Sequence, residues 1–164
     1  MGAHQNVVGK FFTGRDLGCS DKFVDLPEKN RRICQYALDN GFDFLFRCDD
    51  DTFTYVDRMV RSTLEFLPDY AGTDCGGFAI GGAGIWLSRR TMEIVARGTW
   101  PAGEWRDDAF IGQVLKDHGG LMFSMPGTAG ENQLLGPVVT EHPVSPERMR
   151  ELYNAITPHP VVVP

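Results

Sequence analysis

The spacing of apolar residues along the chain predicts five helices. Apolar residues recur every three to four positions in these stretches, which is the helical spacing, and turn formers such as Asn40-Gly41 interrupt the pattern. Pro27 suits a first helical position, and the hydroxyls of Thr54 and Ser88 stand where they can cap a helix. The expected helices cover residues 27–39, 56–67, 89–97, 107–116 and 145–155.

Short apolar segments between these helices predict strands. The clearest is Phe-Asp-Phe-Leu-Phe-Arg-Cys at residues 42–48, and short β pieces are expected in the glycine-rich stretch 70–84. Because helices alternate with short buried strands, the expected fold class is α/β, with helices layered on a sheet. Weaker strands are expected at residues 7–13, 121–125 and 138–140, and loops at 14–26 and 127–137.

Length and composition fit one globular domain. The chain has 164 residues, of which 42% are hydrophobic and 23% charged, as in ordinary soluble proteins. We therefore expect a single domain over residues 1–157, followed by a proline-rich tail at 158–164. No apolar run is long enough to span a membrane, and the net charge of −6 does not favour nonspecific nucleic-acid binding. Four cysteines without metal-type spacing indicate reduced thiols in a cytoplasmic protein.

Three consecutive carboxylates, Asp49, Asp50 and Asp51, follow directly on the strand expected at residues 42–48. Like charges placed this close resist joint ionisation, and a bound divalent cation removes that cost. Mg²⁺ and Mn²⁺ prefer oxygen ligands and commonly bridge one or two carboxylates to the phosphates of a substrate. The triplet therefore predicts a metal site, and the alternative is a solvated acidic turn that caps a helix.

Three segments in chain order match one family pattern. They are Phe-Leu-Phe-Arg-Cys-Asp-Asp-Asp-Thr-Phe at 44–53, Gly-Gly-Ala-Gly-Ile-Trp-Leu-Ser at 81–88, and Arg-Asp-Asp-Ala-Phe-Ile-Gly at 106–112. Over about residues 7–145 the chain resembles the fringe-like and β1,3-galactosyltransferase-like glycosyltransferases, which have the GT-A fold. The resemblance implies a GT-A-like, Rossmann-like mixed central sheet flanked by helices, here in a compact or truncated version.

The resemblance also implies an activity. Enzymes of this family move a sugar from a nucleotide diphosphate to an acceptor hydroxyl with inversion at the anomeric carbon. The implied cofactor is Mn²⁺, or Mg²⁺ in its place, and the implied donor is a UDP-sugar. The expected acceptor is a saccharide, a protein side chain or a hydroxymethylated base in DNA.

The family's metal and base positions map onto residues of this chain. By the resemblance, Asp51 and Asp49 are metal ligands together with His142, which a helix-like segment follows. Asp108 matches the general base, the group that takes the proton from the attacking hydroxyl. The alternatives are that Asp107 and Asp108 are acids at a helix N-terminus, and that His142 is an ordinary loop histidine.

The remaining site residues are assigned to the two substrates. Arg15 follows the expected first strand and Arg47 precedes the acids, so each guanidinium can pair with a phosphate. Solvated charge is the alternative for Arg15, and neutralisation of the neighbouring acids is the alternative for Arg47. Trp105 flanks the acidic pair and offers a flat apolar face to a sugar. Glycines allow close approach of a ligand to the backbone, or else mark a strand bulge. The donor-binding set is Arg15, Arg47, Asp50, Gly82 and Ala83, and the acceptor-binding set is Trp105, Asp107 and Gly84.

Relatives of this kind usually begin with an earlier nucleotide-binding strand, and they carry a membrane anchor and disulfides. The lack of these features favours a phage or bacterial enzyme in the cytoplasm, either a minimal version or a chain without that strand. Two other functions stay open at this point. One is a non-catalytic nucleotide- or sugar-binding module, and the other is a metal-dependent phosphoesterase that uses the same aspartates.

Overall fold

The computed structural model describes residues 7–99, 106–120, 123–124 and 139–156. The helices are α1 (Gly14–Leu17), the 3-10 helix η1 (Phe23–Asp25), α2 (Leu26–Asp39), α3 (Val56–Phe66), α4 (Arg89–Arg97), α5 (Asp107–Asp117) and α6 (Pro146–Ile156). The strands are β1 (Phe44–Arg47), β2 (Phe53–Thr54), β3 (Tyr70–Gly72), β4 (Ile85–Ser88), β5 (Phe123–Ser124) and β6 (Thr140–Glu141).

The helices predicted from apolar spacing are confirmed as α2 to α6. Pro27 lies in the first turn of α2, and the Ser88 hydroxyl caps α4 by accepting from the Thr91 N–H. Thr54 does not stand next to a helix, because it is part of β2 and α3 begins at Val56. Helix bounds therefore agree with the sequence pattern to within one or two residues.

The strand expected at residues 7–13 is wrong. These residues have no regular structure, and Val7, Val8 and Phe11 are 50%, 62% and 81% exposed, so no sheet covers their apolar side chains. The loop expected at 14–26 is also partly wrong, since it contains α1 and η1. Thr13 and Asp16 form a capping box, in which each side chain bonds the other residue's backbone N–H. These hydrogen bonds start helix α1 at the position where the apolar residues had predicted the end of the strand 7–13.

The main sheet is mixed and has the strand order β1-β4-β3-β5. β4 runs antiparallel to both neighbours, and β3 pairs in parallel with β5. β2 and β6 form a separate antiparallel pair. The α/β class with a mixed sheet is confirmed in this form. The strands predicted at 121–125 and 138–140 correspond to β5 and β6, whereas the loop at 127–137 and the tail at 158–164 lie outside the described residues.

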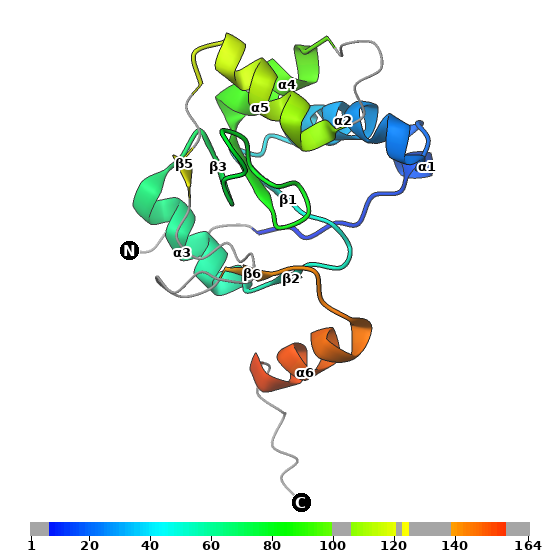
Figure 1. Ribbon diagram of the computed structural model, residues 1–164, viewed down its shortest axis with the longest axis vertical. Coiled ribbons are helices and arrows are strands. Elements are labelled where there is room, and N and C mark those ends of the chain that lie inside the picture. The colour runs from blue at the N-terminus through cyan, green and yellow to red at the C-terminus, as the bar shows by residue number, and fades with distance from the viewer. Residues whose placement is uncertain (1–6, 100–105, 121–122, 125–138, 157–164) are drawn as a thin grey trace, which may run out of the picture.

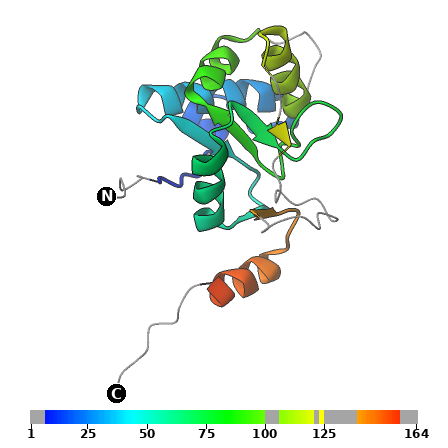
Figure 2. The ribbon, with the colours of Figure 1, turned by 90° about the vertical axis from the view of Figure 1, so that its left-hand side faces the viewer.

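Helices cover both faces of the main sheet (Figures 1 and 2). On one face α2, α4 and α5 enclose a core with Ile85 and Leu87 of β4, which are at most 1% exposed. Trp86, between Ile85 and Leu87 on β4, points to the other face of the sheet. There it packs with Phe44 and Phe46 of β1 and with Met59 of α3. Helix α6 extends away from this body at the end of the described chain. None of the described helices is long and apolar enough to cross a membrane.

Antiparallel pairing decides where the acidic residues lie. Arg47 at the end of β1 pairs with Ile85 at the start of β4, so the chain after β1 runs beside the chain before β4. The residues that flank the three aspartates, Arg47 and Thr52, therefore lie against Gly81 and Gly82. The rule that places sites outside the carboxyl ends of strands in open α/β sheets does not explain this arrangement, because β1 and β4 run in opposite directions.

Candidate functional site

Three segments that are distant in sequence meet at the turn formed by residues 81–84, which we call the glycine turn. The turn is closed by a hydrogen bond of 3.2 Å from the Gly84 N–H to the Gly81 carbonyl, and its residues are buried. The acidic loop after β1, the segment after β6 and the first turn of α5 each contact it. Gly84 has a φ of +119°, which a residue with a side chain rarely adopts.

The glycines of this turn give space to side chains of the chain itself. A β-carbon added at Gly81 would collide with Nη1 of Arg47, and one at Gly84 would collide with the ring of Phe46. At Gly82 the collision would be with the imidazole of His142. The sequence offered two reasons for these glycines, a strand bulge and close approach of a ligand. Neither included the packing of side chains against the turn. The ligand contacts assigned to Gly82, Ala83 and Gly84 stay predictions.

On the Gly82 side of the turn, Asp51 and His142 come together. Asp51 Oδ1 lies 3.1 Å from His142 Nδ1, and the same nitrogen lies 3.0 Å from Thr52 Oγ1. The Thr52 hydroxyl donates to the Gly82 carbonyl at 2.6 Å, so its oxygen is left to accept from the imidazole. Thr52 was not singled out from the sequence, although it directly follows the acid triplet.

Two further hydrogen bonds hold β6 and the segment after it against this side. The Thr140 hydroxyl donates to the Ala83 carbonyl at 2.7 Å, and the Val144 N–H donates to the Asp51 carbonyl at 2.9 Å. Thr140 is fully buried. Backbone and buried side-chain bonds thus fix the position of the histidine relative to the aspartate, although the two residues are far apart in the sequence.

Asp51 Oδ1 and His142 Nδ1 are 3.1 Å apart, which is a hydrogen-bond distance and also close to the separation of about 3.0 Å between adjacent ligands of an octahedral ion with bonds of about 2.1 Å. An ion held by these two atoms would replace the Nδ1 proton that Thr52 accepts in this structure. Asp49 and Asp50 are exposed, and Asp49 lies 3.4 Å from Nη2 of Arg47. Within the described ranges, no three His, Cys, Asp or Glu side chains form a metal-binding group. An ion held here would take its remaining ligands from water or from phosphate.

On the Gly81 side of the turn lies Asp108, in the first turn of α5. Its Oδ2 accepts the Gly81 N–H at 3.3 Å, and its Oδ1 accepts the Ala109 N–H at 2.7 Å. The helix N-terminus favours a negative charge at this position. The carboxyl group is half-buried and fixed in orientation by the two donors, so it can act on a group that enters beside the turn.

Asp107 points instead into the protein. Its Oδ2 accepts from Nη2 of Arg47 and from Nδ2 of Asn30, each at 2.6 Å, and the residue is 8% exposed. The acceptor-binding assignment of Asp107 stays a prediction, and in this structure the carboxylate is occupied by these two partners. Asn30 was missed in the sequence. Its signal is a polar residue in the apolar stripe of α2, between the buried residues Pro27 and Cys34.

Two side chains of neighbouring segments have pKa values that burial raises. Burial raises the pKa of Tyr70 to about 12, and the nearby charges of Asp108 and Asp74 act in the same direction. The Tyr70 hydroxyl accepts the Ala79 N–H at 2.7 Å and so supports the segment that leads into the glycine turn. Burial likewise raises the pKa of the Cys48 thiol just before the acid triplet. These groups are neutral near pH 7 and serve as packing.

Three predicted site residues, Asp50, Arg15 and Trp105, are not brought to the glycine turn by any described contact, and Asp50 is exposed. Arg15 is exposed on α1, which packs against α2 at one end of the molecule (Figure 1). Trp105 lies outside the described residues. Their donor and acceptor roles stay predictions.

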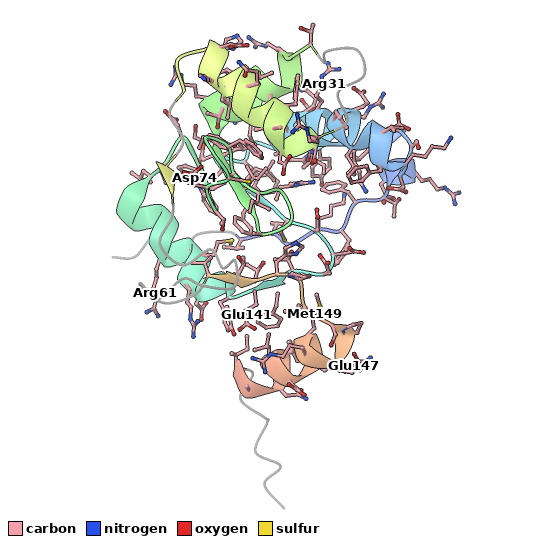
Figure 3. All side chains as sticks on the ribbon, viewed as in Figure 1. Arg31, Arg61, Asp74, Glu141, Glu147 and Met149 are labelled. Atoms are coloured by element: carbon pink, nitrogen blue, oxygen red, sulfur yellow. The ribbon has the colours of Figure 1, made fainter. Side chains whose placement is uncertain are left out.

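A tyrosine-glutamate contact lies next to His142 on the outer surface. Tyr55 donates to Glu141 at 2.6 Å, and Arg148 of α6 lies 3.6 Å from the same carboxylate. Glu141 is seen on β6 toward α6, near the labelled Met149 (Figure 3). This contact ties α6 to the segment that carries the histidine.

A cavity of about 360 Å³ is lined by Tyr70 and by residues of α5 that include Ala109, the neighbour of Asp108. None of the predicted site residues lines it, and it is bounded by α5 and the loop after β3, which carries Asp74 (Figure 3). A scan against protein-family models found no match for the chain, and a search of curated proteins found none. A functional assignment therefore depends on the geometry at the glycine turn and on the motif resemblance.

Proposed function

We propose that this chain is an inverting, metal-dependent glycosyltransferase with a GT-A-like fold. In this proposal it moves a sugar from a nucleotide diphosphate sugar, with UDP as the expected nucleotide, to an acceptor hydroxyl. One observation carries the proposal. The Asp51–His142 pair and the Asp108 carboxylate touch neighbouring residues of one turn, Gly82 and Gly81, although they come from three separate segments.

The Asp51–His142 pair supports the donor half of the reaction. These two residues would hold Mn²⁺ or Mg²⁺ and leave other positions of the ion for the two phosphates of the donor. When bound, the ion offsets the charge that develops on the leaving diphosphate. Both side chains are open to solvent, with 49% exposure for Asp51 and 21% for His142, so a ligand can reach them.

Asp108 supports the acceptor half. The acceptor oxygen attacks the anomeric carbon while the bond from that carbon to the diphosphate oxygen breaks, and the hydroxyl proton passes to the Asp108 carboxylate. A single displacement of this kind inverts the configuration and needs no covalent bond to the protein. The two backbone donors fix the carboxylate, so the attacking hydroxyl meets a base with a defined position.

The experiment combines binding and turnover on the wild-type chain. Calorimetry with UDP is run with and without Mn²⁺, and a panel of nucleotide sugars is incubated with Mn²⁺ while free nucleotide diphosphate is measured. A second panel offers saccharide, peptide and hydroxymethylated-DNA acceptors. Mn²⁺-dependent UDP binding together with sugar transfer is the expected result.

Two outcomes would overturn the proposal. Metal-dependent UDP binding without turnover on any donor would favour a binding module. Phosphodiester cleavage without sugar transfer would favour a phosphoesterase.

A further inference from the structure

A buried polar network joins the acidic loop to the helix that carries Asp108. Arg47 is the last residue of β1 and Asp107 is the first residue of α5, and their side chains are 10% and 11% exposed. Nη2 of Arg47 lies 2.6 Å from Asp107 Oδ2 and 3.4 Å from Asp49 Oδ1. One guanidinium nitrogen therefore links a carboxylate of the acidic loop to the carboxylate at the start of α5.

Asn30 completes the network from a third element. Its side chain donates to the same Asp107 oxygen at 2.6 Å, and the residue is 3% exposed on α2. The Asp107 carboxylate thus receives donors from a strand and from a helix, both packed in the core. Its position at the start of α5 is fixed from two directions.

The guanidinium of Arg47 is closed to solvent on the side of the glycine turn. Nη1 is buried, has no hydrogen-bond partner among the described residues, and faces Gly81. A diphosphate bound from solvent does not reach an atom in this position without a rearrangement. The contacts observed for Arg47 are with carboxylates of the protein, and the contact with Asp49 matches the alternative that Arg47 neutralises the neighbouring acids. Its donor contact stays a prediction.

Buried ion pairs of this kind are poor sources of stability. Replacement by apolar residues of similar volume is often neutral or stabilising, because desolvation of two charges offsets their attraction. What such a pair supplies is a defined geometry, since a planar guanidinium accepts carboxylates only in certain directions. The geometry set here is the position of the first turn of α5 relative to the acidic loop.

We propose that Arg47 is a positioning residue, which through Asp107 sets the location of Asp108 relative to the donor side of the glycine turn. This inference rests on the proposed function. Arg47 holds Asp49 and Asp107 in one arrangement, Asn30 locks Asp107, and the next residue of the helix, Asp108, then faces the Gly81 N–H. Arg47 itself touches neither substrate.

The test compares Arg47→Met, Asp107→Asn and the double variant with the wild type. We expect each single variant to lower kcat on the order of 10²-fold, the loss typical of a misplacement of about 1 Å. Donor KM and the Mn²⁺-dependent affinity for UDP stay at the wild-type values. The double variant loses no more kcat than either single variant, because both changes break the same link.

Conservative and matched controls separate this role from ordinary structural support. Arg47→Lys keeps the positive charge but lacks the planar guanidinium with its several donors, so its kcat should lie between those of Arg47→Met and the wild type. Arg31→Met removes an arginine of α2 that donates to the Ala96 carbonyl away from the glycine turn (Figure 3), and it leaves kcat unchanged. A Tm series on the same variants detects loss of folding, and the double variant should melt above the less stable single variant, since it leaves no unpaired buried charge.

Each contrary result has a distinct meaning. A raised donor KM and weaker UDP binding with an unchanged kcat in Arg47→Met would show a direct donor contact and overturn the positioning role. Wild-type kcat in that variant would overturn it as well. A wild-type protein that transfers no sugar would refute the proposed function instead, and the Tm series would then still show whether Arg47 and Asp107 are coupled.

Discussion

The two sides of the glycine turn carry similar charges in different environments. On the Gly82 side, the Asp51 and His142 side chains are 49% and 21% exposed. On the Gly81 side, the Arg47 and Asp107 side chains are 10% and 11% exposed and are bonded to each other. Exposed charges can exchange water for a ligand, whereas buried ones already have protein partners. We therefore interpret the Gly82 side as a binding surface and the Arg47–Asp107 pair on the Gly81 side as a scaffold.

This difference decides which carboxylates can do chemistry. A buried charge needs a partner to offset its desolvation, so Asp107 is not available to a substrate without the loss of Arg47. Asp108, the next residue in sequence, is half-buried and receives only backbone N–H donors in the described contacts. Adjacent aspartates at the start of one helix thus have different roles, because successive residues on a helix face different directions.

The largest loss of activity is expected from a substitution on the exposed Gly82 side. Asp51→Ala removes a carboxylate 3.1 Å from the His142 imidazole, so both Mn²⁺-dependent UDP binding and sugar transfer should fall to background. Calorimetry and a transfer assay measure the two losses. Folding should change little, because exposed ion pairs contribute about 0–1 kcal/mol to the free energy of unfolding.

Asp43→Ala is the matched control for that variant. Asp43 is exposed just before β1, at the end of the strand opposite to the acid triplet, and its removal should leave binding and transfer intact. If Asp51→Ala bound UDP with Mn²⁺ as tightly as the wild type, the Gly82 side would not be the binding surface.

Loss of the base should affect turnover alone. Asp108→Asn keeps the size of the side chain and removes its ability to accept the hydroxyl proton. Transfer should fall by about 10²- to 10⁴-fold, as is typical for general bases, while Mn²⁺-dependent UDP binding is retained. Asp117→Asn, the same change at the other end of α5, is the control and should keep full activity. Wild-type transfer in Asp108→Asn would exclude this residue as the base.

The sequence predicted the elements of the site better than their arrangement. Apolar spacing is a local property, so α2 to α6 could be located from it. The segment 7–13 has strand-like composition, but strand formation needs a partner, and the exposed Val8 and Phe11 lack one among the described residues. The position of the acids beside the glycine turn follows from antiparallel pairing of β1 with β4, which no local pattern encodes.

The network at Arg47 was hidden for the same reason. Asn30 and Asp107 are 77 positions apart in sequence, and only the packing of α2 against α5 brings them together. The sequence did contain a hint, since an asparagine between apolar stripe positions of a helix needs a buried partner. The identity of that partner could not be inferred from one sequence.

Removal of one partner of the buried ion pair should lower stability more than any change on the exposed side. Asp107→Ala leaves Arg47 and Asn30 without their shared acceptor, and loss of one partner of a buried pair typically costs about 3–5 kcal/mol. Urea unfolding of this variant beside Asp51→Ala measures the contrast directly, with the midpoint expected to fall strongly only for Asp107→Ala. Equal midpoints for the two variants would remove the distinction between binding surface and scaffold.

The smallest effect expected is a loss of metal response when the turn itself is altered. Gly82→Ala places a methyl group against the Nε2 edge of the His142 imidazole, so the ring must shift from its position beside Asp51. Overpacking of this kind costs about 1–3 kcal/mol, and titration should show a weaker response of UDP binding to Mn²⁺ while the α5 side keeps its geometry. Gly9→Ala is the control, because an added β-carbon there meets nothing within 4 Å. An unchanged Mn²⁺ titration in Gly82→Ala would mean that the imidazole position does not govern the ion, and Asp51 would then act without His142.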